Sequence, residues 1–95
     1  MNILRNDTSF YIEIDNNVIA YINFIYKDKQ IIEVTKTFVS ETYAGRGIAK
    51  ILTEELIKYV QNNNLKIIPT CSYTRNYLLK HPELSSLIYW FFLKE

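Results

Sequence analysis

The sequence is poor in the residues that usually shape small folds, because its 95 residues include only two glycines, two prolines and one cysteine. A single cysteine excludes an intrachain disulfide and fits a reducing compartment. The scarcity of glycine and proline leaves the turns to asparagine, aspartate and lysine, as in Asp15-Asn16-Asn17 and Lys27-Asp28-Lys29. Gly45 and Gly47 fall in one turn, which marks a place of special geometry.

An excess of one charge is also lacking, since eleven lysines and arginines face ten aspartates and glutamates. A dedicated nucleic-acid binder usually has a strong basic excess. No apolar run reaches the roughly 20 residues of a membrane span, and residues 1–7 lack the apolar stretch of a signal peptide. No cysteine–histidine cluster suggests a metal site. We therefore expect a cytoplasmic protein, one domain over residues 1–95, without nucleic-acid, membrane or metal partners.

The first half of the chain has the two-residue hydrophobic period of β-strands. Residues 10–14 alternate between apolar and polar side chains, residues 18–26 are nearly all apolar or β-branched, and residues 31–39 alternate again. Polar turns between these segments predict a three-stranded antiparallel meander. One face of the third strand should carry its apolar side chains, namely Ile32, Val34 and Phe38.

The second half changes to a helical period. Residues 48–61 place apolar side chains three or four positions apart, which predicts an amphipathic helix that Asn62-Asn63-Asn64 would end. Residues 66–69 predict a short strand parallel to the third one, because a helical crossover precedes it. Residues 72–80 predict a second helix and residues 84–93 a third. The expected fold class is therefore mixed α/β.

The two glycines lie in the turn between the third strand and the long helix. Glycine adopts positive φ and lets a ligand approach the backbone closely. The first N–H groups of a helix have no partner in the chain, and with the helix dipole they favour a phosphate or pyrophosphate. Arg46 would add a permanent cation there. The alternative is an ordinary strand-to-helix turn whose glycines serve geometry alone.

The order of these elements resembles the Gcn5-related N-acetyltransferases, and in particular their small members that keep only the acetyl-CoA-binding core. The resemblance spans residues 10–83 and rests on two segments. The first ends in Gly45-Arg46-Gly47-Ile48-Ala49, and the second contains Cys71-Ser72-Tyr73. The implied fold has a third strand and a later parallel strand that splay apart, with C-terminal helices after them.

The resemblance implies that acetyl-CoA binds with its pantetheine arm in that gap. Phe38 and Val39 would line one side, and residues 68–70, ending in Thr70, the other. Asn76 and Tyr77 of the second helix would also contact the coenzyme, with a plain core role as the alternative for Tyr77. The pyrophosphate would bind the turn and the start of the helix, that is Ala44, Gly45, Arg46, Gly47, Ile48, Ala49 and Lys50.

Cys71 and Lys36 are the catalytic residues that the resemblance implies. Cys71 would lie beside the thioester, where it would accept the acetyl group or give a proton to the departing coenzyme A. Lys36 stands where these small proteins commonly have histidine, and it would lower the pKa of the thiol. Ala44 stands where glutamine or arginine is usual, which removes one side-chain contact to the pyrophosphate. A cysteine that only packs is the alternative for Cys71.

The implied activity is transfer of acetyl from acetyl-CoA to a primary amine. A coenzyme A-binding sensor or interaction module without turnover is the alternative, favoured by Ala44 and Lys36, and a scaffold that binds nothing is a third interpretation. Few residues flank the core, so the acyl end should open onto a broad surface, which favours an amine on a protein or peptide. Trp90-Phe91-Phe92 would complete the core or mediate self-association, so a monomer or weak homodimer is expected.

Overall fold

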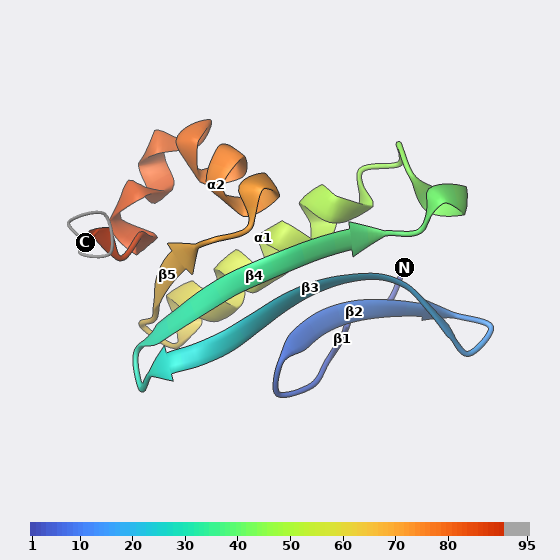
Figure 1. Cartoon of the computed structure of the whole chain (residues 1–95), viewed down its shortest axis with the longest axis horizontal. Helices are drawn as coiled ribbons and strands as arrows, with labels where there is room; N and C mark the ends of the chain where they lie inside the picture. The colour runs from blue at the N-terminus through green and yellow to red at the C-terminus, as the bar shows by residue number, and fades with distance from the viewer. Residues whose placement is uncertain (91–95) are drawn as a thin grey trace.

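A five-stranded sheet in the strand order β1-β2-β3-β4-β5 organises the chain, of which the computed structural model describes residues 1–90 (Figure 1). The first four strands pair antiparallel, and β5 joins β4 in parallel. Both the predicted meander and the predicted parallel strand are therefore confirmed. The strands are β1 (Leu4–Arg5), β2 (Ser9–Ile14), β3 (Asn17–Asp28), β4 (Ile31–Val39) and β5 (Lys66–Pro69).

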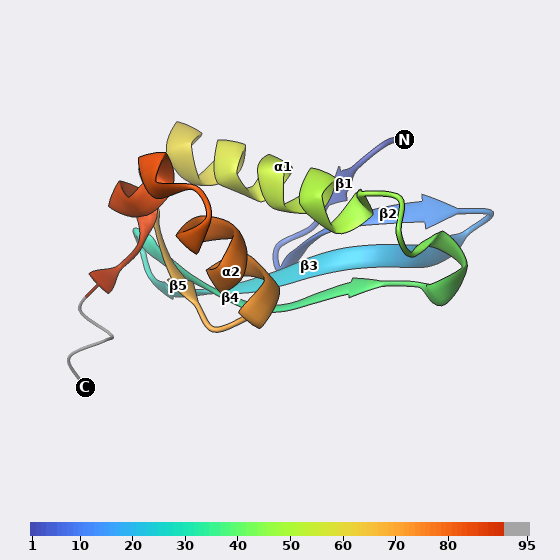
Figure 2. The ribbon, with the colours of Figure 1, turned by 90° about the horizontal axis from the view of Figure 1, so that it is seen from above.

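Two α-helices and two 3₁₀ helices complete the described chain, namely η1 (Glu41–Tyr43), α1 (Ile48–Asn62), α2 (Ser72–Leu79) and η2 (Pro82–Leu87). Helix α1 runs along one face of the sheet, here called the inner face (Figure 2). Over β2 and β3, no helix of residues 1–90 covers the opposite face, here called the outer face (Figures 1 and 2). Neither α-helix in this part of the chain is long and apolar enough to cross a membrane.

The core forms between α1 and the inner face because the buried side chains of α1 recur at helical spacing. Leu52, Leu56 and Val60 are completely buried, as are Ile22 of β3 and Ile32 of β4. The helix ends where it was expected to end, with Asn62 as its last residue and Asn64 in the left-handed conformation at φ 53°. This packing fixes the N-terminus of α1 beside the end of β4.

Strand β1 was not predicted, because two residues are too few to show a hydrophobic period. Leu4 pairs with Tyr11, and Arg5 pairs with Phe10. The Arg5 guanidinium also lies over the ring of Tyr59 in α1, 5.0 Å from its centroid. This cation–π contact ties the edge of the sheet to the helix.

A helix was predicted over residues 84–93, and the part of this segment that the structure describes, up to residue 90, contains the short 3₁₀ helix η2 instead of an α-helix. After η2 the chain is extended, and Ile88 forms a parallel bridge with Ile67 of β5. Ile88 is buried, so covering the free edge of β5 outweighs the helical preference of this segment. Trp90 remains 47% exposed and donates its indole N–H to the Ser85 carbonyl at 3.0 Å. Phe91 and Phe92 lie outside the described residues.

A β-bulge at Thr35 divides β4 into two halves. Val34 pairs with Phe24, whereas Lys36 pairs with the next residue of β3, Asn23. Thr35 is thus the extra residue that opposes no partner of its own. Such a bulge bends its strand and increases the local twist.

The bulge changes which side chains face the core. Before it, Ile32 and Val34 point inward and are fully buried. After it, Thr37 takes the inner side, while Phe38 points outward, 40% exposed, and stacks on Tyr21 with ring centroids 5.2 Å apart. The prediction that Phe38 shares a face with Ile32 and Val34 is therefore wrong, because one extra residue shifts the alternation.

Strands β4 and β5 separate at the bulge, so the predicted splay is confirmed. Strand β5 pairs only with residues 31–34 of β4, and the last pair joins Val34 to Pro69. The Cys71 N–H then donates to the Val34 carbonyl at 2.8 Å, after which α2 leads the chain away. Residues 35–39 consequently have β3 on one edge and no strand of the described chain on the other (Figure 1).

Candidate functional site

The glycine turn has a backbone conformation that other residues rarely adopt. Gly45 has φ +78° and Gly47 has φ +76°, both in the left-handed region that glycine favours. A Cβ atom added at either position would meet no other heavy atom within 4 Å. The two glycines therefore leave an open space at the N-terminus of α1.

The amides of this turn are free of backbone acceptors. The Ala44 N–H donates to the Glu41 carbonyl at 3.2 Å, and the next hydrogen bond begins at Ile51, which donates to the Gly47 carbonyl at 3.1 Å. Between them, the amides of residues 45–50 have no backbone acceptor among residues 1–90. Among the residues expected at the pyrophosphate, Ala44 thus has its amide engaged by the Glu41 carbonyl, although it lines the groove described next.

A groove of about 340 Å³ lies beside these amides and is lined by four elements and the turn between them. Tyr73 of α2 forms one wall, so the groove connects the turn with the second helix. Its other lining residues come from the end of β4, the turn and the first turn of α1, namely Val39, Tyr43, Ala44, Gly45, Gly47, Ile48, Ala49 and Lys50. The structure thus brings together most of the residues that the sequence suggested for a pyrophosphate.

The charges around the groove suit an anion. The first turn of α1 contains no acidic residue, although carboxylates are normally favoured there by the helix dipole. Lys50 lines the groove instead. Arg46 does not line it, and its guanidinium lies over the ring of Tyr43, 5.3 Å from the centroid. A bound phosphate would compensate the cations and the dipole together.

A smaller groove of about 190 Å³ continues along α2 on the other side of Tyr73. It is lined by Tyr73, Asn76, Tyr77 and Lys80. Burial, and secondly the Glu54 carboxylate, raise the pKa values of Tyr73 and Tyr77, so both hydroxyls remain protonated donors at neutral pH. Asn76 and Tyr77, which were expected to contact the coenzyme, therefore line a second groove that shares Tyr73 with the first.

The side chain at the end of this second groove does not provide a base. His81 stacks on Tyr77 with centroids 4.3 Å apart, and its Nδ1 lies 3.2 Å from the Glu83 carboxylate. Both interactions place the imidazole at the end of α2, away from the cysteine that begins this helix. His81 is thus a residue of the helix end.

Cys71 is the N-cap residue of α2 and lies between this helix and β4. Its side chain is 8% exposed, and its Sγ lies 3.4 Å from the Oγ1 of Thr37. The Thr74 hydroxyl, one turn into α2, is completely buried and makes no hydrogen bond of ordinary geometry. The hydroxyls of Thr37 and Thr74 therefore both lie close to the Cys71 thiol.

The surroundings of Cys71 favour the thiolate. Burial alone raises the pKa of the thiol, but the Thr37 hydroxyl, the Thr74 amide and hydroxyl, and the Tyr73 amide all lower it. The sum places the Cys71 pKa below its ordinary value. Thiolates are the reactive form of cysteine, so this thiol is better suited to react than one that only packs.

Lys36 does not take part in this environment. Adjacent residues of a strand point to opposite faces, so Lys36 lies on the outer face while Thr37 contacts the thiol on the inner face. Lys36 is also not among the groups that shift the Cys71 pKa. The expectation that Lys36 lowers the Cys71 pKa is therefore wrong. The neighbouring residue Thr37 has this effect through its hydroxyl.

Thr70 was expected to line the gap between β4 and β5. Its hydroxyl donates to the carboxylate of Glu33, in the paired half of β4, at 2.6 Å, and Glu33 also lies 3.7 Å from the Lys27 ammonium. The Thr70 carbonyl accepts a hydrogen bond from Arg75 at 2.9 Å. These contacts anchor the loop between β5 and α2.

This arrangement, in which a splayed strand pair meets a glycine turn at a helix N-terminus, is accompanied by a match in sequence. Residues 9–87 match the family of GCN5-related N-acetyl-transferases. The chain belongs to this family. Its expected fold class and family are thereby confirmed.

Three comparisons illustrate the relationship. Protein NATD1 of Gallus gallus is 35% identical over 63 residues, which cover 66% of this chain and 57% of that protein. The chain thus spans little more than half the length of such relatives. The NMR structure of a GCN5-like protein of Staphylococcus aureus, assigned as an N-acetyltransferase, superposes with a TM-score of 0.75 at 31% identity, covering 92% of this chain and 86% of that one.

The third comparison includes the coenzyme. The crystal structure of a GNAT family acetyltransferase from Elizabethkingia anophelis was determined with acetyl-CoA bound. It superposes with a TM-score of 0.56 at 21% identity, covering 76% of this chain and 50% of that one. At this identity the likeness concerns the fold alone.

Three residues of the site were missed by sequence reasoning, namely Thr37, Thr74 and Tyr73 as a groove wall. Thr37 was missed because regular alternation, with Ile32, Val34 and Phe38 on the core side, gives no sign of a bulge. The position of Thr74, three residues after Cys71, did carry a signal, because a helix N-terminus places that residue one turn above its cap. Polar residues on the outer face of β2 and β3 were also not considered.

Proposed function

We propose that this chain is an N-acetyltransferase that transfers the acetyl group of acetyl-CoA to a primary amine. The observation that carries the proposal is the position of the Cys71 thiol. The thiol lies where β4 and β5 separate. Beyond this point one edge of β4 is unpaired, and the strand ends just before the glycine turn with its free amides. Family membership and the likeness to the GCN5-like protein of Staphylococcus aureus support the same activity.

The coenzyme is proposed to bind along this path. Its pyrophosphate would accept hydrogen bonds from the amides of residues 45–50, close to Lys50. Its pantetheine arm would pair with the free edge of β4 at Phe38 and Val39 through the backbone, in the manner of an added strand. The thioester would then lie near Cys71. Tyr73, Asn76 and Tyr77 would flank the coenzyme from α2.

The lowered pKa of Cys71 favours the nucleophilic role over proton donation. In this role the thiolate attacks the carbonyl carbon of the thioester, the bond from that carbon to the coenzyme sulfur breaks, and coenzyme A leaves as a thiolate. The neutral amine then attacks the acetyl-cysteine, which restores the Cys71 thiolate and releases the amide after loss of one proton. The first helical turn of α2 would stabilise the Cys71 thiolate, both before it is acetylated and after the amide is released.

Isothermal titration with acetyl-CoA and a thiol-release assay with an amine panel test the proposal together. We expect acetyl-CoA to bind and coenzyme A to be released in the presence of lysine-containing peptides, with lower rates on free small amines. Mass spectrometry of a quenched reaction should find an acetyl group on Cys71 in the absence of acceptor. Absence of acetyl-CoA binding would contradict the proposal.

A second candidate is a coenzyme A-binding module without turnover. It is favoured by the positions of Lys36 and His81. Lys36 lies on the outer face and His81 lies at the far end of α2, so neither is placed beside the thiol to take a proton from the amine. Tight binding of acetyl-CoA without thiol release on any amine would identify this function. The protein or peptide acceptor, the cytoplasmic location and the monomer or weak dimer stay predictions.

A further inference from the structure

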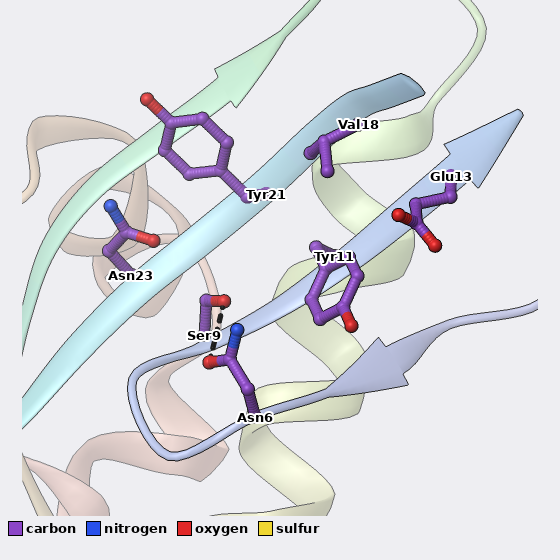
Figure 3. Close-up of a pocket in the computed structure, with 7 residues that line it drawn as sticks. All are labelled: Asn6, Ser9, Tyr11, Glu13, Val18, Tyr21 and Asn23. Carbon is purple, nitrogen blue, oxygen red and sulfur yellow. Dashed lines mark hydrogen bonds between the residues drawn. The ribbon is translucent and has the colours of Figure 1, made fainter. Parts of the chain in front are cut away.

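The outer face carries a second hollow of about 340 Å³, over β2 and β3, which shares no lining residue with the groove at the glycine turn (Figure 3). Tyr11 and Glu13 of β2 line it together with Tyr21 and Asn23 of β3. Asn6 closes one end of the hollow. No step of the proposed reaction uses any of these residues.

The rings and the amide of this hollow are held in place by the sheet and its first turn. Tyr11 and Tyr21 are direct partners across β2 and β3, so both side chains stand on the outer face, and the Tyr21 ring stacks on Phe38 with centroids 5.2 Å apart. The Asn6 side-chain oxygen accepts hydrogen bonds from the Thr8 amide at 2.9 Å and the Ser9 hydroxyl at 3.0 Å. Ser9 is itself 7% exposed, so the amide is fixed against a buried partner.

The chemistry of the hollow suits a cation. Glu13 is the only charged residue that lines it, and no ion pair engages this carboxylate within residues 1–90. A carboxylate with the Tyr11 ring two residues away on the same face attracts an ammonium or a guanidinium, by charge and through the face of the ring. Lys36 pairs with Asn23, at the end of the hollow away from Glu13. Figure 3 shows the Tyr11, Tyr21 and Glu13 side chains all on the exposed side of the two strands.

The hollow also lies at a defined distance from the reaction. Asn23 pairs with Lys36 and Tyr21 pairs with Phe38, so the next strand is the unpaired half of β4. Neighbouring strands are about 4.8 Å apart, so Tyr11 of β2, which pairs with Tyr21, lies roughly 10 Å across the sheet from the free edge of β4. A peptide would pass around this edge to reach the thioester on the inner face. Three residues of an extended peptide span about the same distance.

We propose that the hollow binds a second basic side chain of a peptide acceptor, about three residues from the lysine that is acetylated. This inference rests on the acetyl-transfer function proposed above and specifies its substrate class as basic peptide segments. A peptide is favoured over a small polyamine because the hollow is an open depression on a broad sheet face, which cannot enclose a small ligand as binding pockets do.

Two peptides that differ at one side chain test the proposal. Each carries one lysine, and three residues away one carries arginine and the other citrulline, its neutral analogue. We expect the wild-type protein to prefer the arginine peptide by about tenfold in kcat/KM, through KM. Glu13→Gln should reduce the arginine peptide to the level of the citrulline peptide. Glu55→Gln, on α1 and paired with Lys58, is the matched control and should leave the preference unchanged.

Binding without coenzyme separates this inference from the proposed function. In an NMR titration with the arginine peptide, the amide signals of Tyr21 and Asn23 should shift, and Glu13→Gln should abolish the shifts. If these shifts occur but no peptide is acetylated, the cation site stands and the transfer function fails. If peptides are acetylated with equal kcat/KM, if Glu13→Gln keeps the preference, or if spermidine is a better acceptor than both peptides, the inference is overturned.

Discussion

The two halves of β4 are neighbours in one strand, yet they differ in what surrounds them. Residues 31–34 pair with β3 on one edge and β5 on the other, and Ile32 and Val34 are fully buried. Residues 35–39, beyond the bulge, keep only the pairing with β3. The first half therefore serves the core, and the second half exposes backbone and the Thr37 hydroxyl to the site.

One inserted residue, Thr35, separates the part of β4 that stabilises the fold from the part that faces the candidate site. Strand pairing leaves few backbone groups free for a ligand, whereas an unpaired edge offers a row of donors and acceptors. Because the bulge bends β4 away from β5, the same sheet contains both kinds of edge. Changes in the first half should thus affect unfolding, and changes in the second half should affect coenzyme binding and thiol chemistry.

The largest expected effect is on the first half. Ile32→Ala should lower the free energy of unfolding by about 2–5 kcal/mol, because Ile32 is completely buried between β3, β5 and α1. Urea denaturation would measure this loss. Acetyl-CoA affinity of the folded fraction should remain within about twofold of the parent, and a large loss of affinity would break the division between the halves.

Deletion of Thr35 should remove the bulge and leave the register intact, since Val34 and Lys36 keep their partners Phe24 and Asn23. A straighter β4 would stay closer to β5, so we expect acetyl-CoA affinity to fall about a hundredfold. Thr35→Ala is the matched control, because it keeps the bulge and loses only the long 3.4 Å hydrogen bond to the Asn23 carbonyl. Titration calorimetry on both variants would measure the difference. Equal affinities would show that the bulge does not open the site.

Gly47→Asn should weaken acetyl-CoA binding about tenfold without unfolding the turn. Asparagine tolerates the left-handed conformation, as Asn16 does in this chain at φ 65°, and the added side chain would enter the open space before α1. Valine is a poorer choice, because a β-branched residue is strained at φ +76°. Calorimetry measures the affinity and thermal unfolding provides the control. An unchanged Kd would mean that the coenzyme does not approach this backbone.

The smallest expected effect concerns the pKa of Cys71. The Thr37 hydroxyl opposes the rise caused by burial, so Thr37→Val should raise the midpoint of iodoacetamide alkylation against pH, while Thr37→Ser should retain the lower midpoint. The parent midpoint should lie below the free-thiol value of about 8.5. Parent and Thr37→Val midpoints that coincide would exclude Thr37 from the thiol environment.

This shift also makes a small contribution to stability whose sign is defined. The native thiol has the lower pKa, so between the native and unfolded values the unfolded chain binds more protons. The contribution is therefore present above the unfolded pKa and is lost as the pH falls through the native pKa. In Thr37→Val this pH-dependent part of the unfolding free energy should shrink.

Much of the fold could be predicted because its signals are local and periodic. The α1 stripe, the polar turns and the two glycines each show in a short stretch of sequence, and the structure has them where they were expected. The glycine turn was likewise found at the start of α1. Local patterns were therefore sufficient to predict most strands and helices, and the glycine turn of the candidate site.

The remainder depends on contacts between distant residues. The bulge at Thr35 arises from pairing with β3, so the outward position of Phe38 and the inward position of Thr37 could not be inferred from alternation. The buried Thr74 hydroxyl depends on how α2 packs on β4, and the extended Ile88 on the free edge of β5. Residues near the thiol were misassigned for this reason, Lys36 in place of Thr37.

The central claim is that acetyl-CoA binds between the glycine turn and the unpaired half of β4. An NMR titration of the uniformly ¹⁵N-labelled protein with acetyl-CoA tests it directly. The account predicts saturable shifts of the Gly45, Gly47 and Val39 amides, with the Ile32 and Val34 amides unchanged. Saturation at another surface, or no saturable shift in the turn and residues 37–39, would contradict the account.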